Sequence, residues 1–362
     1  MSAGVSLFAT TRDNGAVSEM HQRQILLDWL GVEGQRRLAE SHAMVVGCGA
    51  IGGVVIEWLA RAGVGQLTLV DRDIVETSNL HRQVLFTAQD AADRVPKAEA
   101  AARRVRSLAT GTRVHACVEH CGPENAEELA RGVHVIADGL DNMESRMVLN
   151  DLAVRDRIPF VHAAAVAMQG RSMAIVPGYA CLRCAFPEMP APGVLQTCDT
   201  AGVLGPVVGL AGSFAALQVL RLAAGREDLL LHGLWSADLE TNRITTISVP
   251  RDPACTCCAQ KKFEFLNAAV ERTAHVCGRG AVQVLPPHGS GQSVNLSGIA
   301  ERLSRHGHFD HHGDRLHGEL VDAVNAEGQP YELTVFGDGR VIVGRCTDLE
   351  AAQSVADRFV GG

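Results

Sequence analysis

The chain of 362 residues contains no run of about 18 apolar residues, so we expect no membrane-spanning helix. The segment from Met1 to Asn14 also lacks the charged and then apolar layout of a secretory signal peptide. These two absences predict a cytoplasmic protein. An excess of positive charge is missing as well, because 33 Lys and Arg stand against 41 Asp and Glu, for a formal net charge of -8. We therefore expect no nucleic-acid partner, since phosphate backbones are bound by cationic surfaces.

The composition is that of a globular enzyme, with 46% apolar and 20% charged residues. The length suffices for one large and one small domain. The 11 cysteines, in a reducing compartment, indicate metal binding or thiol chemistry rather than disulfides.

Short apolar runs alternate with helical patterns along most of the chain. The first strand–helix–strand unit is predicted over 43–47, 50–62 and 66–70. Such alternation is typical of a Rossmann-like, doubly wound α/β fold with a mostly parallel sheet. Later strands are predicted at 113–118, 133–137, 159–162 and 173–177, helices at 96–108, 123–131, 142–157 and 202–224, and an added strand pair at 234–239 and 243–249.

The chain divides into four predicted segments. We expect a loose arm over 1–17, a large α/β domain over 18–258, a connection over 259–280 and a small α/β domain over 281–362. In the small domain, Gly337-Asp338-Gly339 between alternating runs is a hairpin signal. Five histidines fall in a predicted loop of that domain, which we expect to be solvated rather than metal-binding: His306, His308, His311, His312 and His317.

A glycine-rich loop connects the first predicted strand to the first predicted helix. Glycines let the backbone turn tightly and approach a phosphate, and the amides at a helix start favour negative charge. Asp71 ends the next strand and is placed to accept hydrogen bonds from a ribose. The alternative is a tight turn without a ligand, and the loop alone does not separate ATP from a dinucleotide. The loop reads Gly47-Cys48-Gly49-Ala50-Ile51-Gly52.

Polar residues after Asp71 separate the two nucleotides. Nucleotidyl transfer needs cations to offset phosphate charge and a carboxylate to hold Mg²⁺, whereas hydride transfer has little use for them. The sequence therefore predicts ATP and Mg²⁺, with an NAD-dependent oxidoreductase as the alternative. The candidate nucleotide-binding residues are Gly47, Gly49, Ala50, Gly52, Asp71, Asp73, Asn79, Arg82, Gln83, Lys97 and Asp141.

Two Cys-x-x-Cys pairs lie far apart in the sequence. Cys181 with Cys184, and Cys255 with Cys258, offer four thiolates in the arrangement that suits a tetrahedral structural Zn²⁺. Such a metal would tie two distant segments together. The alternative is four unliganded or redox-active cysteines, and Cys257 is an extra thiol with a less favourable spacing.

Together these motifs resemble one family. The chain resembles the ThiF/MoeB/HesA adenylyltransferases, the bacterial relatives of ubiquitin-activating enzymes, over roughly residues 20 to 258. Met20-His21 departs from the Arg-Tyr that this family usually shows, and Leu140 departs from its Thr. The motifs that carry the resemblance are Gln22-Arg23-Gln24, the glycine loop, LTLVD ending at Asp71, Ser78-Asn79-Leu80-x-Arg82-Gln83, Pro96-Lys97, Asp141-Asn142, the cysteine pairs, and Cys198 before Ala201-Gly202-Val203-x-Gly205-Pro206.

The resemblance implies a role for individual residues of these motifs. Asp71 would hold the ribose of ATP, while Asn79, Arg82 and Lys97 would contact the triphosphate and Asp141 would coordinate Mg²⁺. The implied reaction activates the C-terminal glycine carboxylate of a ubiquitin-like or sulfur-carrier protein ending in Gly-Gly as an acyl-adenylate. Transfer to a thiol or to sulfur follows, with a sulfurtransferase as a possible further partner. Activation of another carboxylate, on a peptide, a small molecule or a tRNA-bound group, and a non-catalytic scaffold stay open as alternatives.

Five further expectations concern Arg23, two thiols and the C-terminal part of the chain. The resemblance implies that Arg23 reaches into the active site of a second subunit, which requires a homodimer. It also implies that Cys198, after the proline-rich stretch 186–193, bonds covalently to the carrier; an unreactive thiol is the alternative. Cys277 is a second thiol candidate. The small C-terminal domain is expected to dock the partner, and Gly361-Gly362 is expected to be a chance ending rather than a fused substrate.

Overall fold

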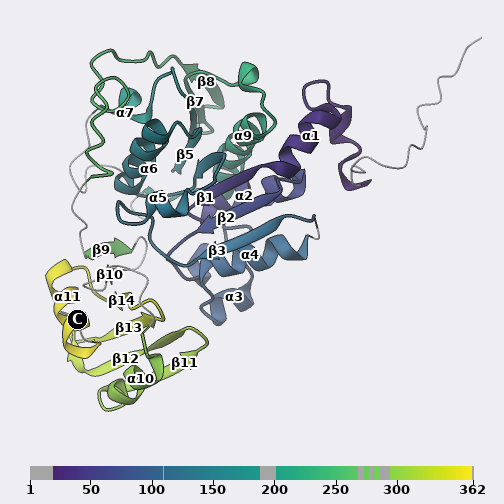
Figure 1. Cartoon of the computed structure of the whole chain (residues 1–362). Coiled ribbons are helices and arrows are strands. Elements are labelled where there is room, and N and C mark those ends of the chain that lie inside the picture. Colours follow the sequence, from purple (N-terminus) through teal and green to yellow (C-terminus); the bar gives the residue numbers. More distant parts are fainter. Residues whose placement is uncertain are drawn as a thin grey trace, which may run out of the picture.

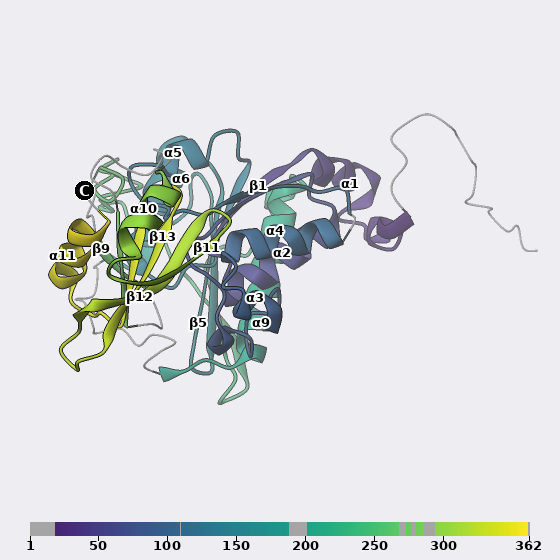
Figure 2. The same ribbon diagram turned by 90° about the horizontal axis from the view of Figure 1, so that it is seen from below.

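The computed structural model describes residues 19–108, 110–187, 201–267, 273–276, 280–285 and 294–360. Two β-sheets organise these residues, one of eight strands and one of six (Figure 1). In both views the second sheet and helix α1 lie at opposite ends of the molecule (Figures 1 and 2).

The eight-stranded sheet has the order β3-β2-β1-β4-β5-β6-β7-β8. Its strands from β3 to β5 are parallel, and β6, β7 and β8 are added antiparallel to them. The predicted Rossmann-like, mostly parallel sheet with an added strand pair is therefore confirmed. The strands are β1 (His42–Val46), β2 (Gln66–Val70), β3 (Arg113–Cys117), β4 (Val135–Asp138), β5 (Phe160–Val166), β6 (Gln169–Ile175), β7 (Leu234–Asp238) and β8 (Arg243–Ile247).

Helices cover both faces of this sheet. Successive side chains of a strand point to opposite faces, and β1 places Val45 in the core under α2, α4 and α9 but Met44 in the core under α5, α6 and α7. Short 3₁₀ turns at Glu19–His21, Gln24–Leu26, Thr77–Asn79 and Glu227–Leu229 connect the larger elements. The helices are α1 (Gly31–Glu40), α2 (Ala50–Ala62), α3 (Ala88–Ala92), α4 (Lys97–Ser107), α5 (Ala126–Leu129), α6 (Met143–Asp156), α7 (Leu182–Ala185) and α9 (Gly205–Ala223).

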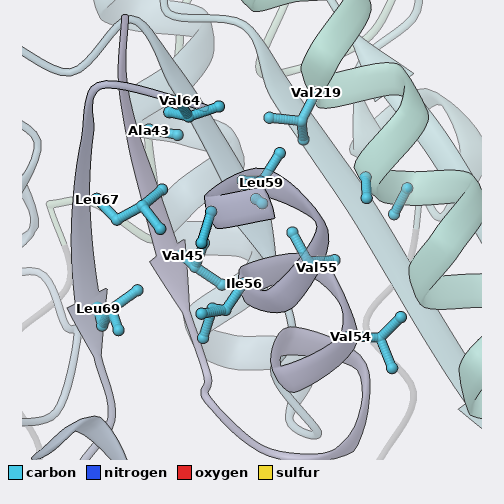
Figure 3. Packing of buried hydrophobic residues seen from close by; sticks show 14 of the residues in the cluster. Ala43, Val45, Val54, Val55, Ile56, Leu59, Val64, Leu67, Leu69 and Val219 are labelled. Atoms are coloured by element: carbon cyan, nitrogen blue, oxygen red, sulfur yellow. The ribbon is translucent and has the colours of Figure 1, made fainter. Parts of the chain in front are cut away.

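Branched aliphatic residues fill the space between β1, β2 and α2. Val45 and Leu67 of the strands face Ile56 and Leu59 of the helix, and all four are completely buried (Figure 3). Close packing extends to α9, where a Cβ placed on Gly212 would lie only 2.7 Å from Cβ of Val54. This core fixes α2, and with it the glycine loop that opens the helix.

Among the described residues, one helix is long and apolar enough, by length and composition alone, to cross a membrane. This helix is α9, and 44% of its apolar stretch is buried inside the protein. It packs on α2, β5 and β6 in the middle of the α/β domain. We attribute its apolar character to that packing, as for the core helix of a globular protein.

The six-stranded sheet is antiparallel throughout, with the order β11-β12-β13-β14-β10-β9. Helices α10 (Leu296–Leu303) and α11 (Leu349–Phe359) share a hydrophobic core with one face of it. The predicted second α/β unit is therefore present, and it is built from β9 (Thr273–Val276), β10 (Ala281–Val284), β11 (Gly307–His312), β12 (Arg315–Val324), β13 (Pro330–Phe336) and β14 (Val341–Gly344).

Two local expectations for this region were wrong. Residues 273–276 were predicted as connection but pair with β10 as strand β9. The histidine-rich stretch was predicted as a loop, yet residues 307–312 form the edge strand β11 and His317 lies in β12. The pattern failed because this edge strand has just one apolar side chain, Phe309, against the core and is otherwise polar and mostly exposed. Within the described residues, no group of three or more potential metal ligands includes these histidines.

Candidate active site and metal centre

The glycine loop is held by contacts that exclude side chains. Gly47 has a φ of 87°, and a Cβ there would lie 2.6 Å from the carbonyl carbon of Gly139, just after β4. A Cβ on Gly52 would lie 1.7 Å from the carbonyl oxygen of Gly47. Both positions therefore require glycine because of backbone packing.

Gly49 differs from its neighbours because it faces open space. A Cβ there would meet just one side-chain atom, Nε2 of Gln83, at 3.7 Å. Gly49 is the N-cap of α2, so the amides of the first helical turn, beginning at Ala50, have no acceptor within the helix. The loop thus presents backbone donors to an anion at a helix N-terminus.

Asp71 ties the end of β2 to this loop. Its Oδ2 accepts a hydrogen bond from the backbone amide of Cys48 at 2.7 Å, and its Oδ1 accepts one from the amide of Asp73 at 2.8 Å. Burial raises the pKa of Asp71 to about 6, while the positive charge of Lys97 opposes the shift. The structure therefore places the predicted ribose ligand directly beside the glycine loop.

We expect the affinity for a ribose-containing nucleotide to fall as the pH is lowered through about 6, because a proton on Asp71 removes an acceptor. The pH dependence of the folding stability has the opposite direction to that of nucleotide binding. Since the folded-state pKa lies above the ordinary 3.8, the stabilisation that it reflects is present below 3.8 and is lost as the pH rises through about 6. Calorimetric titration with ATP between pH 5 and 8 measures the binding step. The variant Asp71→Asn is the control, because any pH dependence of its ATP affinity comes from groups other than Asp71, including the nucleotide itself. If the ATP affinity of the wild type and of the variant depends on pH in the same way, the prediction is contradicted.

Lys97 lies on the other side of Asp71. Its Nζ donates to Oδ2 of Asp73 at 2.9 Å, its backbone amide donates to the carbonyl of Asp73 at 2.8 Å, and it is only 8% exposed. The ammonium is close enough to favour the ionised forms of both Asp71 and Cys48, although burial raises the pKa of each. A buried cation therefore stands next to the glycine loop, as predicted.

The segment from Glu76 to Gln83 contains the 3₁₀ turn Thr77–Asn79 and brings Gln83 beside Gly49. Oδ1 of the buried Asn79 accepts from the amide of Glu76 at 3.2 Å, which closes a capping box. The partly exposed Arg82 donates from Nη1 to the carbonyl of Ser78 at 2.9 Å. Oε1 of the buried Gln83 has no hydrogen-bond partner in the described part of the chain. A buried acceptor of this kind, next to open space at Gly49, fits a ligand with hydroxyl or amide donors.

Asp141 is exposed at the end of β4. The backbone just before it runs against the glycine loop, since the amide nitrogen of Leu140 lies 2.8 Å from a Cβ placed on Gly47. The next residue, Asn142, is the N-cap of α6 and accepts from the amide of Ser145 at 2.9 Å. The structure thus brings the strand end that carries Asp141 to the same sheet edge as Gly47 and Asp71.

A buried polar triad that the sequence reasoning missed supports this strand end. Oδ2 of Asp138 accepts from Nε of Arg146 at 2.9 Å and lies 2.6 Å from Nδ1 of His162. Oδ1 of Asp138 accepts from the amide of Leu140 at 2.8 Å, and Arg146 also donates to the carbonyl of Leu140. Burial lowers the pKa of His162. The sequence signal was a carboxylate three positions before Asp141 at the end of an apolar strand.

Arg23 is not brought to this site. The residues flanking it pack at the far end of α2, where Nε2 of His21 lies 3.2 Å from the carbonyl of Arg61 and Gln24 donates to the carbonyl of Ala62 at 2.8 Å. The helix has 13 residues, so roughly 20 Å separate this end from the glycine loop at 1.5 Å per residue. Arg23 is exposed there, and its predicted role in a second subunit stays a prediction.

Four cysteines from the two predicted pairs converge. Their sulfur atoms lie within 4.8 Å of one another, with 3.9 Å between Cys181 and Cys184, 3.6 Å between Cys181 and Cys255, and 3.5 Å between Cys184 and Cys258. A tetrahedral zinc with Zn–S bonds of about 2.3 Å sets its sulfur atoms about 3.8 Å apart. The cluster therefore has the spacing of a four-thiolate metal site.

Asn150 of α6 braces the two cysteine pairs. Its Oδ1 accepts from the amide of Leu182 at 2.8 Å, and its Nδ2 donates to Sγ of Cys257 at 3.3 Å. Cys257 is fully buried and is not a member of the converging four. Its thiol contacts Asn150 and also Cys181, one of the four, without belonging to the group. The spacing argument for Cys255 and Cys258 agrees with the geometry.

Several candidate positions lie outside the described residues. These are Cys198, Cys277 and Gly361-Gly362, and their roles stay predictions. Four further cysteines, Cys48, Cys117, Cys121 and Cys346, are all buried.

The doubly wound fold, with a glycine loop, an acidic strand end and a buried lysine at one sheet edge, defines a nucleotide-binding α/β protein. The chain belongs to the ThiF family, whose model matches residues 21–257. The predicted family is thus confirmed.

Among characterised relatives, the chain is 35% identical over 350 residues to the sulfur carrier protein ThiS adenylyltransferase of Bacillus subtilis, covering 94% of this chain and 99% of that protein. It is 37% identical over 256 residues to the SAMP-activating enzyme E1 of Haloferax volcanii, covering 71% and 92%. These names agree with the predicted enzyme class. A crystal structure of E. coli MccB with ATP superposes with a TM-score of 0.59 at 22% identity, over 67% of this chain and 75% of that one, and supports the fold.

Proposed function

We propose that this protein is an ATP-dependent adenylyltransferase that activates the C-terminal carboxylate of a small sulfur-carrier or ubiquitin-like protein. The observation that carries the proposal is the grouping of Asp71, Lys97 and the end of β4 beside the glycine loop. The similarity along nearly the whole chain to a ThiS adenylyltransferase points to the substrate class.

The proposed reaction is a displacement at the α-phosphorus of ATP. The carboxylate oxygen of the carrier's last residue forms the new P–O bond, the bond between the α-phosphorus and the bridging oxygen to the β-phosphate breaks, and pyrophosphate leaves. No general base is required, because a carboxylate is already ionised near pH 7. The protein's task is to position the two reactants and to offset the charge that develops on the phosphates.

Individual residues divide this task. Asp71 accepts hydrogen bonds from the ribose, and Lys97 and Arg82 face the phosphates with positive charge. Asn79 orders the turn that carries Arg82. Asp141 would hold a Mg²⁺ ion, whose chemistry is to neutralise phosphate charge; an exposed carboxylate at this sheet edge suits a hard cation.

We also propose that the four-cysteine cluster holds a structural Zn²⁺. The sulfur spacing supports tetrahedral thiolate ligation by Cys181, Cys184, Cys255 and Cys258. The metal ties the chain after β6 to the chain after β8. The cluster leaves no fourth position for water, so its role is structural rather than catalytic.

The assembly and the second half-reaction extend this proposal. Arg23, exposed about one helix length from its own glycine loop, is suited to reach the site of a second subunit in a homodimer. A sulfur nucleophile, either a thiol of this chain such as Cys198 or the sulfur of a partner sulfurtransferase, then attacks the carbonyl carbon of the acyl-adenylate. A C–S bond forms, the C–O bond to the phosphate breaks, and AMP leaves.

The test is carrier-dependent adenylation. The purified protein, ATP and Mg²⁺ are mixed with a small protein ending in Gly-Gly that is encoded beside this gene. We expect pyrophosphate exchange, together with a mass increase of one adenylyl group on the carrier tail. The matched control is the same carrier without its last glycine, which should support neither signal. If every carrier encoded in the genome leaves the exchange rate at background, the substrate class is wrong.

A further inference from the structure

Arg340 is a buried arginine that belongs to the second sheet but bonds to the large domain. It follows the turn between β13 and β14 and is only 1% exposed. Its Nη1 donates to the backbone carbonyl of Arg72 at 3.4 Å, and its Nη2 donates to the carbonyl of Val118. Asp338 accepts from Nε at 2.6 Å, and the guanidinium lies 4.5 Å from the ring centre of Phe336. The charge is therefore compensated and its orientation fixed within its own sheet.

The two carbonyl acceptors lie at the strand ends that hold Asp71. Arg72 stands between Asp71 and Asp73, whose carboxylates contact the glycine loop and Lys97. Val118 directly follows Cys117, whose carbonyl accepts from the amide of Asp71 at 3.1 Å. Arg340 thus links the ends of β2 and β3 from outside, one residue away from the proposed ribose ligand.

Apolar packing surrounds this link. Ile74, which continues the same segment, is buried together with Phe336 and Ile342 of the second sheet. Nearby, Nη2 of Arg315 donates to the carbonyl of Asp93 at 3.0 Å, and Arg315 is 6% exposed. Beyond these contacts a cleft of about 460 Å³ separates residues 75–78 from β13 and β14. The contacts between the two sheets therefore include the backbone that carries Asp71 and Asp73.

We propose that Arg340 is a positioning residue for the nucleotide site, through which the C-terminal domain holds the Asp71-Arg72-Asp73 segment in its ATP-binding conformation. The inference rests on the proposed function in that ATP is the nucleotide bound. It gives the domain a role in ATP affinity that is separate from docking a carrier. A planar guanidinium with two donors on two carbonyls is suited to this task, because it fixes their spacing as a single ammonium does not.

The test compares full-length variants in which Arg340 or a control arginine is changed. The matched control is Arg345→Gln, because Arg345 belongs to the same domain and its partners Glu319, Glu332 and the carbonyl of Pro330 all lie in that domain. We expect Arg340→Gln to weaken the Kd for ATP roughly tenfold, since hydrogen bonds from a charged group are lost. Arg340→Lys should restore part of the affinity, and Arg345→Gln should match the wild type.

Two further readouts separate positioning from general destabilisation. The KM for ATP should rise in Arg340→Gln while the KM for the carrier stays unchanged. Amide exchange should increase over 71–74 while the amides of α10 and α11 stay protected, which shows that the domain is still folded. If Arg340→Gln does not fold, Arg340→Lys is used for the same three measurements.

A Kd for ATP that is equal in wild type and in Arg340→Gln overturns the inference. So does an equal loss of affinity in Arg345→Gln, or a change confined to the KM for the carrier. ATP binding is measured without any carrier. A protein that bound ATP yet adenylated no carrier would therefore contradict the proposed function and leave the result for Arg340 interpretable.

Discussion

Replacement of Lys97 by Ala is expected to lower the rate of carrier-dependent pyrophosphate exchange by about 10² to 10³-fold, the usual effect of removing one preorganised charge-stabilising group. The ammonium is 8% exposed and is held by Asp73 at 2.9 Å, so it occupies its position before substrates arrive. The lysine is also the first residue of α4, so its backbone position is fixed by the helix.

The Lys97→Ala variant has a second expected phenotype. Lys97 favours the ionised form of Asp71 against burial, so its removal shifts the pH step in ATP binding above about 6. The matched control is Arg106→Ala, which removes an exposed cation from the same helix. The pyrophosphate-exchange rates of the wild type, Lys97→Ala and Arg106→Ala, measured at saturating ATP, test whether Lys97 takes part in the reaction. A Lys97→Ala enzyme with wild-type exchange would show that the cation has no part in the reaction.

Loss of the cysteine cluster should have the largest effect on stability. We expect Cys181→Ser to abolish a stoichiometric zinc content and to lower the melting temperature by roughly 10 °C, which corresponds to about 3–5 kcal/mol at 2–4 °C per kcal/mol. The physical reason is that the binding free energy of a structural metal is also folding free energy. The cluster joins α7 to residues 255–258, which pack into the core that contains α6.

Cys257→Ser is the matched control for the zinc prediction. Cys257 is equally buried but lies outside the group of four, and it accepts a hydrogen bond from Asn150 that a hydroxyl also accepts. Metal analysis and thermal denaturation should therefore give one zinc per chain and a nearly unchanged melting temperature. Zinc retained in Cys181→Ser, or lost in Cys257→Ser, would show that the ligand set is wrong.

The sequence predicted those elements whose signals are local. Helix α2 was found at 50–62 because glycines bound it on both sides: Gly49 is its N-cap, and Gly63 ends it in the left-handed conformation with a φ of 84°. Strand β2 was found at 66–70 because it is a buried apolar run. Strand β11 was missed because its exposed histidines show no apolar face, and only pairing with β12 makes it a strand.

The same distinction applies to the site. Asp71 was predicted because it ends the second strand of a strand–loop–helix–strand motif, and Lys97 because it belongs to a set of polar residues that together resemble the family. The triad of Asp138, Arg146 and His162 was not, because its members come from β4, α6 and β5 and meet only when those elements pack. No local sequence pattern predicts this contact, since a single arginine within a helix is usually interpreted as an exposed surface charge.

The mutual contact of three glycines has a consequence for motion in the protein. Gly47, Gly52 and Gly139 bring the loop, the first turn of α2 and the end of β4 into backbone contact, with no side chain between them to yield. A displacement of any one of these pieces must be shared by the other two, so they move as a rigid unit. Asp141 follows Gly139 by two positions, and its separation from the amides of the loop is consequently set when the chain folds. The site is therefore preorganised for a nucleotide, and binding does not require the loss of conformational entropy that arranging these groups would otherwise cost.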